Sequence, residues 1–98
     1  MEEITLGAVD AFTAFPAEVQ LGNRLYFLLK KEEEYRLVSS ICPHAGYTVE
    51  VEDGELVCPL HGWSFDTQTG ACLNVPSKEL APYDVVVREG RLVALMPA

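Results

Sequence analysis

Basic residues are scarce in this chain of 98 residues. Seven lysines and arginines stand against fifteen aspartates and glutamates, which leaves a formal net charge of −8 at pH 7. Such a balance repels phosphate backbones and anionic lipid headgroups, so we expect neither nucleic acid nor a membrane as a partner. A protein partner with a basic docking face fits better, because opposite fields speed the encounter.

Long apolar runs are also missing. No stretch approaches the roughly 20 apolar residues that a membrane span needs. The N-terminus, Met1-Glu2-Glu3-Ile4-Thr5, lacks the basic and apolar regions of a secretory signal. We therefore expect a cytoplasmic protein, in which stable disulfides are rare. The three cysteines, Cys42, Cys58 and Cys72, are an odd number and cannot form a fully paired disulfide framework.

Helical periodicity is absent as well, and strand signals take its place. Apolar or alternating segments predict strands, and the short polar or glycine-containing segments between them predict turns. The predicted strands are residues 24–29, 35–41, 83–87 and 92–96, and the predicted turns are 21–24, 30–34, 52–55 and 89–90. A short turn over 10–15 is the nearest approach to a helix. Evenly spaced short strands favour an all-β fold, an antiparallel β-sandwich or small barrel.

A chain of this length is expected to form one domain, residues 1–98. We expect residues 1–40 and 76–98 to form a β scaffold. Residues 41–75 are punctuated by glycine and proline, and we expect them to form an inserted loop subdomain that carries the chemistry. A domain this short often needs additional stabilisation, for example from a metal site.

The chain's two histidines stand beside two of its cysteines, in Cys42-Pro43-His44 and Cys58-Pro59-Leu60-His61. Thiolate and imidazole together are ligands for zinc or iron, and the short spacings let both ligands of a group enter one site from one loop. Proline after each cysteine stiffens the loop. Gly46 and Gly62 follow closely and allow the backbone to approach the site without a Cβ. The alternative without a metal is two buried cysteines and two ordinary histidines.

The pattern Cys-x-His … Cys-x-x-His, followed by Gly62-Trp63-Ser64-Phe65-Asp66, resembles the Rieske family. The similarity covers residues 38–96. In the C-terminal part it rests on Thr69-Gly70, Pro76, Leu80, Tyr83, Val85 and Val87.

The resemblance implies a Rieske-like β fold with a [2Fe–2S] cluster held by four residues. Cys42 and Cys58 would ligate one iron, and His44 and His61 the other, with their rings near the surface where partners approach. Pro76 would lie in a third loop that covers the cluster. A structural zinc site has the same donor set, but its spacing usually pairs cysteine with cysteine, so we favour the cluster.

Four positions of the loops depart from the pattern of respiratory Rieske proteins, and two of them bear on the reduction potential. Respiratory Rieske proteins carry two disulfide-forming cysteines where this chain has Tyr47 and Leu60. They also carry a serine and a tyrosine, whose hydroxyls bond the cluster and a ligand sulfur, where this chain has Trp63 and Phe65. Hydrogen bonds to sulfur stabilise the reduced state, so their loss lowers the potential. We predict a potential near the low end of the Rieske range, about −150 mV.

No catalytic site accompanies the cluster motif. Both histidines are assigned as ligands, so none is left for the mononuclear iron of an oxygenase, and no G-x-G-x-x-G follows a predicted strand. The resemblance therefore implies a ferredoxin-type electron carrier, monomeric and not an enzyme by itself, between a flavin reductase and a terminal oxygenase. Two alternatives stay open: the small subunit of a redox enzyme such as NAD(P)H nitrite reductase, and a redox-sensing binding module.

Several other residues have structural interpretations. We expect Cys72 to be a small buried hydrophobe and Trp63 to lie in the core, where it could also shield the cluster. Asp66 is expected either to cap a turn or to bond backbone near the cluster. A solvated hairpin, with docking of a basic partner as the alternative, is expected for Glu50, Glu52, Asp53 and Glu55.

Overall fold

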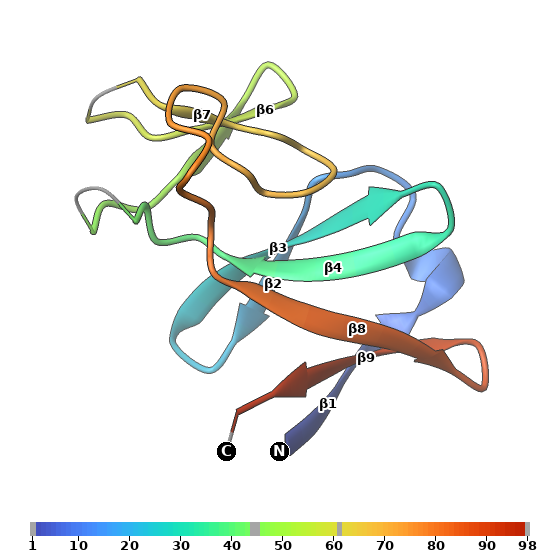
Figure 1. The fold of residues 1–98 in the computed structure, drawn as a ribbon. Helices are drawn as coiled ribbons and strands as arrows, with labels where there is room; N and C mark the ends of the chain where they lie inside the picture. Colours follow the sequence, from blue (N-terminus) through green and yellow to red (C-terminus); the bar gives the residue numbers. More distant parts are fainter. Residues whose placement is uncertain (1, 44–45, 61, 98) are drawn as a thin grey trace.

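The computed structural model describes residues 2–43, 46–60 and 62–97, and two antiparallel sheets carry the fold of these residues (Figure 1). The larger sheet has six strands in the order β1-β9-β8-β4-β3-β2, and the smaller has three in the order β5-β6-β7. The strands are β1 (Glu2–Ala8), β2 (Ala17–Leu21), β3 (Arg24–Lys31), β4 (Glu34–Ser39), β5 (Glu50–Glu52), β6 (Glu55–Val57), β7 (Ser64–Phe65), β8 (Pro82–Arg88) and β9 (Arg91–Met96). The predicted all-β fold is confirmed.

Helical structure is limited, within the described ranges, to the 3-10 turn η1 (Val9–Ala11), which lies where a short turn was expected. Nothing in those ranges forms a helix long and apolar enough to cross a membrane. The small sheet lies over β3 and β4, and the two chain ends lie together on the far side of the large sheet (Figure 1).

Both faces of strand β3 are buried, and this explains its unbroken apolar run. Successive side chains of a strand point to opposite faces. Phe27 and Leu29 pack into a cluster that lies between the two sheets, which we call the site core. Tyr26 and Leu28 pack into a second cluster, the scaffold core, inside the curl of the large sheet. A strand buried on both sides is continuously apolar because neither face meets water.

The two cores draw on different parts of the chain. The site core consists of Phe27, Leu29, Val38, Cys42, Val49, Leu56, Cys58, Phe65, Cys72 and Leu80. The scaffold core consists of Val19, Tyr26, Leu28, Leu37, Leu92, Ala94 and Met96. The site core therefore joins strands β3 and β4 to segments that follow them in sequence, including two of the predicted ligands.

The four predicted strands are confirmed, and the bounds of all four differ slightly. Strands β3, β8 and β9 extend beyond the predicted ranges by one or two residues in total, whereas β4 is shorter than predicted. The strand expected over 35–41 ends at Ser39, because the chain leaves the large sheet there and Ile41 forms only an isolated bridge with Thr48. The turns expected at 21–24, 30–34, 52–55 and 89–90 each connect two paired strands. Strands β2, β5 and β6 were indicated only by the turns predicted at 21–24 and 52–55, and strands β1 and β7 were not predicted. Strand β1 lies at the edge of the large sheet, and its register with β9 shifts between Thr5 and Gly7.

Candidate metal centre

The first predicted cysteine ligand opens a tight turn. The backbone N–H of Cys42 donates a hydrogen bond to the carbonyl of Tyr47 at 2.7 Å. The N–H of Gly46 donates to the carbonyl of Cys42 at 3.0 Å. Gly46 has φ +71°, in the left-handed region that glycine adopts without a steric penalty.

The second predicted cysteine ligand opens a turn of the same design. The N–H of Cys58 donates to the carbonyl of Trp63 at 2.8 Å, and the N–H of Gly62 donates to the carbonyl of Cys58 at 2.8 Å. Gly62 also has φ +71°. The sequence carried a signal for this equivalence that the sequence analysis did not use: Cys-Pro-x-x-Gly-aromatic occurs at 42–47 and again at 58–63. We refer to these two segments as the ligand turns.

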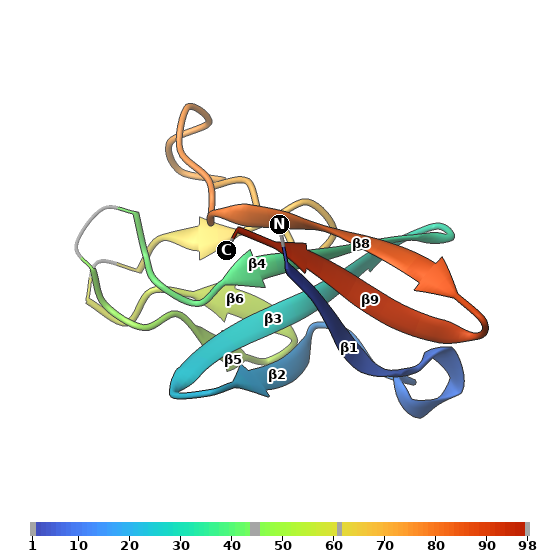
Figure 2. The same ribbon diagram turned by 90° about the horizontal axis from the view of Figure 1, so that it is seen from below.

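The ligand turns bring the two cysteines into one buried environment. Cys42 is 1% exposed and Cys58 is 0% exposed, and both belong to the site core. Figures 1 and 2 show the two turns side by side at the same end of the molecule. Within the described part of the chain no disulfide links any of the three cysteines. Buried thiols at the openings of two matched turns suit iron–sulfur ligation, for which cysteine thiolates are the usual ligands.

The predicted histidine ligands, His44 and His61, lie outside the described residues. In the ranges that are described, no group of three or more histidine, cysteine or acidic residues could hold a metal ion. The structure thus bears on two of the four predicted ligands and brings those two together.

The side chains that flank the ligands divide into exposed and covered ones. Tyr47 and Leu60 are 51% and 44% exposed. Trp63 is partly buried and packs against the site core, and Phe65 is buried within it. The ligand turns therefore carry large exposed side chains on the outside and packed, buried side chains on the inside. Shielding of the cluster by Trp63 stays a prediction.

A third loop packs against the second ligand turn. Cys72 is 2% exposed and belongs to the site core, so the prediction of a buried small residue is confirmed. It forms a bridge with Phe65, and the next N–H, that of Leu73, donates to the carbonyl of Ser64 at 2.8 Å. Pro76 is an exposed residue of this loop. Its expected role in covering the cluster stays a prediction.

Asp66 caps a turn that follows strand β7, which is one of the two roles expected for it. Its Oδ1 accepts hydrogen bonds from the N–H groups of Gln68 at 2.7 Å and Thr69 at 2.9 Å. These bonds favour the ionised carboxylate, so they hold the pKa of Asp66 below its ordinary value of 3.8, the bond from Gln68 having the largest effect.

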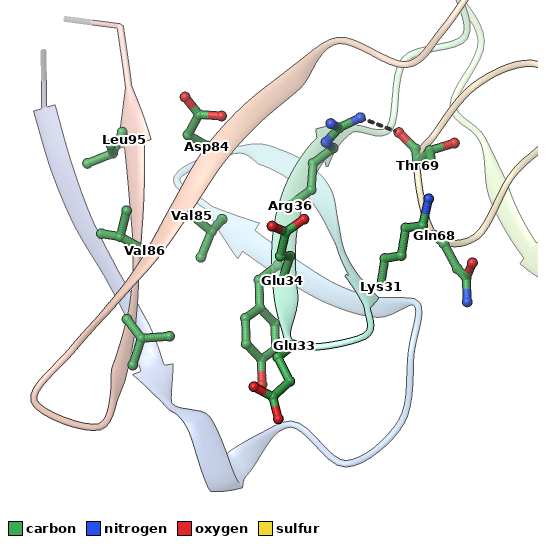
Figure 3. A pocket seen from close by; sticks show the side chains of 12 residues that line it. Lys31, Glu33, Glu34, Arg36, Gln68, Thr69, Asp84, Val85, Val86 and Leu95 are labelled. Atoms are coloured by element: carbon green, nitrogen blue, oxygen red, sulfur yellow. Dashed lines mark hydrogen bonds between the residues drawn. The ribbon is translucent and has the colours of Figure 1, made fainter.

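The Asp66 turn is fastened to the large sheet at two points. The Arg36 guanidinium donates to the carbonyl of Thr69 at 2.8 Å, as Figure 3 shows beside a surface groove between β4 and β8. Gly70 packs so closely on strand β4 that a Cβ there would lie 3.0 Å from Cγ1 of Val38. These contacts fix the segment after the second ligand turn against the scaffold.

Charge is unevenly divided along the chain. Residues 41–75 contain five acidic residues and no lysine or arginine, so they hold most of the net charge of −8. Four of the five, at positions 50, 52, 53 and 55, are exposed on the β5–β6 hairpin, which we call the acidic hairpin. The segment that bears Cys42 and Cys58 therefore presents a negative potential to an approaching partner.

The geometry of the two turns agrees with a family comparison. A model of the Rieske [2Fe–2S] domain matches residues 4–94. The chain belongs to the Rieske [2Fe–2S] family. A Rieske domain binds a [2Fe–2S] cluster, and the two buried cysteines fit the ligation of that cluster.

Two relatives that differ in length are similar to this Rieske chain. It is 26% identical over 97 residues to the ferredoxin component of the alkene monooxygenase system of Xanthobacter autotrophicus, covering 95% of this chain and 74% of that protein. It is 33% identical over 84 residues to a cholesterol 7-desaturase of Xenopus laevis, covering 76% of this chain and 18% of that protein. The chain thus spans less than a fifth of the length of the desaturases it matches.

Solved structures share the fold at lower identity. The ferredoxin of carbazole 1,9a-dioxygenase from Nocardioides aromaticivorans superposes with a TM-score of 0.66 at 23% identity, covering 96% of this chain and 97% of that one. A protein assigned as the small subunit of an NADH-dependent nitrite reductase from Mycobacterium tuberculosis superposes with a TM-score of 0.66 at 21% identity, covering 99% and 96%. The Rieske fold therefore accounts for the whole described chain.

Proposed function

We propose that this Rieske chain is a one-electron carrier whose cluster is held by Cys42, His44, Cys58 and His61. A Rieske cluster, when bound, takes up and releases a single electron. The observation that carries the proposal is the pair of matched ligand turns, each opening on a buried cysteine. In this proposal residues 41–75 form the cluster-binding part of a single domain, between scaffold segments 1–40 and 76–98.

The chain's own residues would bind the cluster and limit its contact with water. Two hydrogen bonds hold the backbone of Cys42, and two hold the backbone of Cys58. The chain therefore loses little conformational freedom when these cysteines bind the cluster. Trp63 and Phe65 pack into the same core and exclude water on that side. A dry, fixed site requires little rearrangement when the charge of the centre changes.

The partners we propose are a flavin reductase as electron donor and a terminal oxygenase as acceptor. Similarity to the ferredoxin component of an alkene monooxygenase system over 95% of the chain supports this. The acidic hairpin and the absence of lysine and arginine from 41–75 favour a basic docking face on the partner. A monomer in the cytoplasm stays our prediction. A fixed subunit of a redox enzyme is the second candidate, because the fold also matches a protein assigned as a nitrite reductase small subunit.

Metal analysis of cysteine variants tests the proposed centre. Anaerobically purified protein should be red-brown, contain equal amounts of iron and acid-labile sulfide, and give a rhombic EPR signal after reduction. Cys42→Ser and Cys58→Ser should lose most of the iron. Cys72→Ser is the matched control, because Cys72 is equally buried in the same core and is expected to keep the iron. Zinc in place of iron in the wild-type protein would refute the proposal.

Rapid kinetics separate the carrier from the fixed subunit. A carrier should be reoxidised by an added oxygenase and leave it after each electron. A fixed subunit should instead copurify with a catalytic chain in a stable complex. Isolation of such a complex from the source cells would show that the chain is a fixed subunit and not a carrier.

A further inference from the structure

Asn74 lies in the third loop, and its side chain contacts the second ligand turn. Its Oδ1 accepts a hydrogen bond from the backbone N–H of Ser64 at 2.8 Å. The N–H of Leu73 donates to the carbonyl of Ser64 at 2.8 Å. The third loop therefore bonds both backbone groups of Ser64. The Asn74 side chain accepts its N–H, and the Leu73 backbone donates to its carbonyl.

The peptide unit between Trp63 and Ser64 connects Asn74 to Cys58. Its carbonyl, from Trp63, accepts the N–H of Cys58 at 2.8 Å. Its N–H, from Ser64, donates to Asn74. A peptide unit is planar and rigid, so a bond that holds its N–H also sets the direction of its carbonyl. Hydrogen bonds in such a chain also polarise and strengthen one another.

Hydrogen bonds fix the third loop on both sides of Asn74. The buried Cys72 donates its N–H to the carbonyl of Lys78 at 2.9 Å, and its Sγ accepts the N–H of Val75 at 3.3 Å. The backbone before and after Asn74 is thus fixed to the site core. A short polar side chain on a fixed backbone loses little entropy when it bonds Ser64.

We propose that Asn74 is the positioning residue of the second ligand turn, which holds the Cys58 backbone in the orientation that keeps its sulfur bound. The inference rests on the proposed function only in taking Cys58 as a ligand. Without the Asn74 bond the turn can open, water gains access to Cys58, and iron is lost more easily. Asn74 itself need not touch the cluster.

Two substitutions at Asn74 and one control elsewhere test this in the cluster-loaded full chain. Asn74→Ala removes the acceptor, Asn74→Asp keeps an acceptor oxygen, and Asn23→Ala removes an exposed asparagine from the β2–β3 turn. The readouts are amide hydrogen exchange of Ser64 and the rate of iron loss to a chelator. In Asn74→Ala both should rise roughly two- to tenfold, the value of one net hydrogen bond. Asn74→Asp and Asn23→Ala should match the wild type.

Unchanged Ser64 exchange in Asn74→Ala would overturn the inference, as would iron loss that Asn74→Asp fails to restore. If Asn74→Ala does not fold, the wild-type protein decides, because a protected Ser64 amide supports the contact and an unprotected one excludes it. Absence of iron from the wild type would refute the proposed function instead, whereas Ser64 exchange would still report on the Asn74 bond.

Discussion

Gly46 and Gly62 occupy matching positions in the two ligand turns. Each donates its N–H to the carbonyl of the cysteine four residues earlier, and each has φ +71°. A Cβ built on either glycine meets no atom of the described residues within 4 Å. Both positions therefore require glycine for its backbone conformation, since space for a side chain is available.

Gly62→Ala should destabilise the cluster-loaded protein by about 1–2 kcal/mol, the cost of a left-handed conformation for a residue with a Cβ. Gly62→Asn should cost less, because asparagine tolerates this region. Urea unfolding measures both. Gly54→Ala is the control, since Gly54 has φ +79° on the acidic hairpin. It should lose similar stability and keep its iron content, whereas Gly62→Ala should lose iron as well. Equal iron content in all variants would contradict this.

Gly70→Ala should cost more, about 2–4 kcal/mol, because backbone strain and overpacking add. Gly70 has φ +83°, and its added Cβ would lie 3.0 Å from Cγ1 of Val38. Urea unfolding in a double-mutant cycle with Val38→Ala separates the two effects. The cost of Gly70→Ala should be smaller when Val38 is already truncated. An unchanged cost in that background would show that the close contact with Val38 contributes nothing.

Ionised Asp66 should stabilise the fold only above a certain pH. Its pKa is lowered in the folded chain, chiefly by the N–H of Gln68, so this contribution is present above the unfolded pKa near 3.8. It is lost as the pH falls through the folded value. Asp66→Asn keeps an acceptor oxygen and removes the charge, at an expected cost of about 1 kcal/mol at neutral pH. The difference in unfolding free energy between wild type and variant should shrink below pH 3.8. A difference that is constant with pH would contradict this.

Removing the charges of the acidic hairpin should slow association with a basic redox partner by about tenfold at low ionic strength. The four carboxylates are replaced by the corresponding amides, and stopped-flow electron transfer is followed against salt concentration. The matched control replaces four exposed glutamates, Glu32, Glu33, Glu34 and Glu89, at the β3–β4 and β8–β9 turns, which lie away from the ligand turns (Figure 1). Equal slowing by both sets would mean that only net charge matters.

A redox titration at neutral pH should give a potential near −150 mV. The reason is the absence of a hydroxyl at Trp63 and Phe65, the positions where respiratory Rieske proteins bond the cluster and a ligand sulfur. Phe65→Tyr should raise the potential, since Phe65 is buried in the same core as Cys58. Tyr47→Phe, which removes an exposed hydroxyl, is the control and should leave it unchanged. A wild-type potential well above zero would refute the prediction.

Local patterns in the sequence predicted four strands and the cysteine–histidine motif of the family. The apolar run before Lys30 and the two apolar segments on either side of Glu89-Gly90 predicted strands that the structure contains. The spacing of cysteine and histidine indicated the family before any fold was known. Strand β1 was not predicted, although Glu3-Ile4-Thr5-Leu6 alternates polar and apolar residues; the run is short, and its pairing with β9 completes the strand. The role of His44 and His61 as ligands stays a prediction.

The sequence by itself determined the ligand motif, the strand-rich fold and the acidic balance, because each depends on residue type and short-range spacing. Only the tertiary structure decided which loops meet. Asn74 bonds Ser64 ten residues away, Arg36 of strand β4 bonds Thr69 in the turn after β7, and Gly70 packs on Val38. Such contacts arise where the chain folds back on itself, and no periodicity in the sequence encodes the distance between two atoms that are brought together by packing.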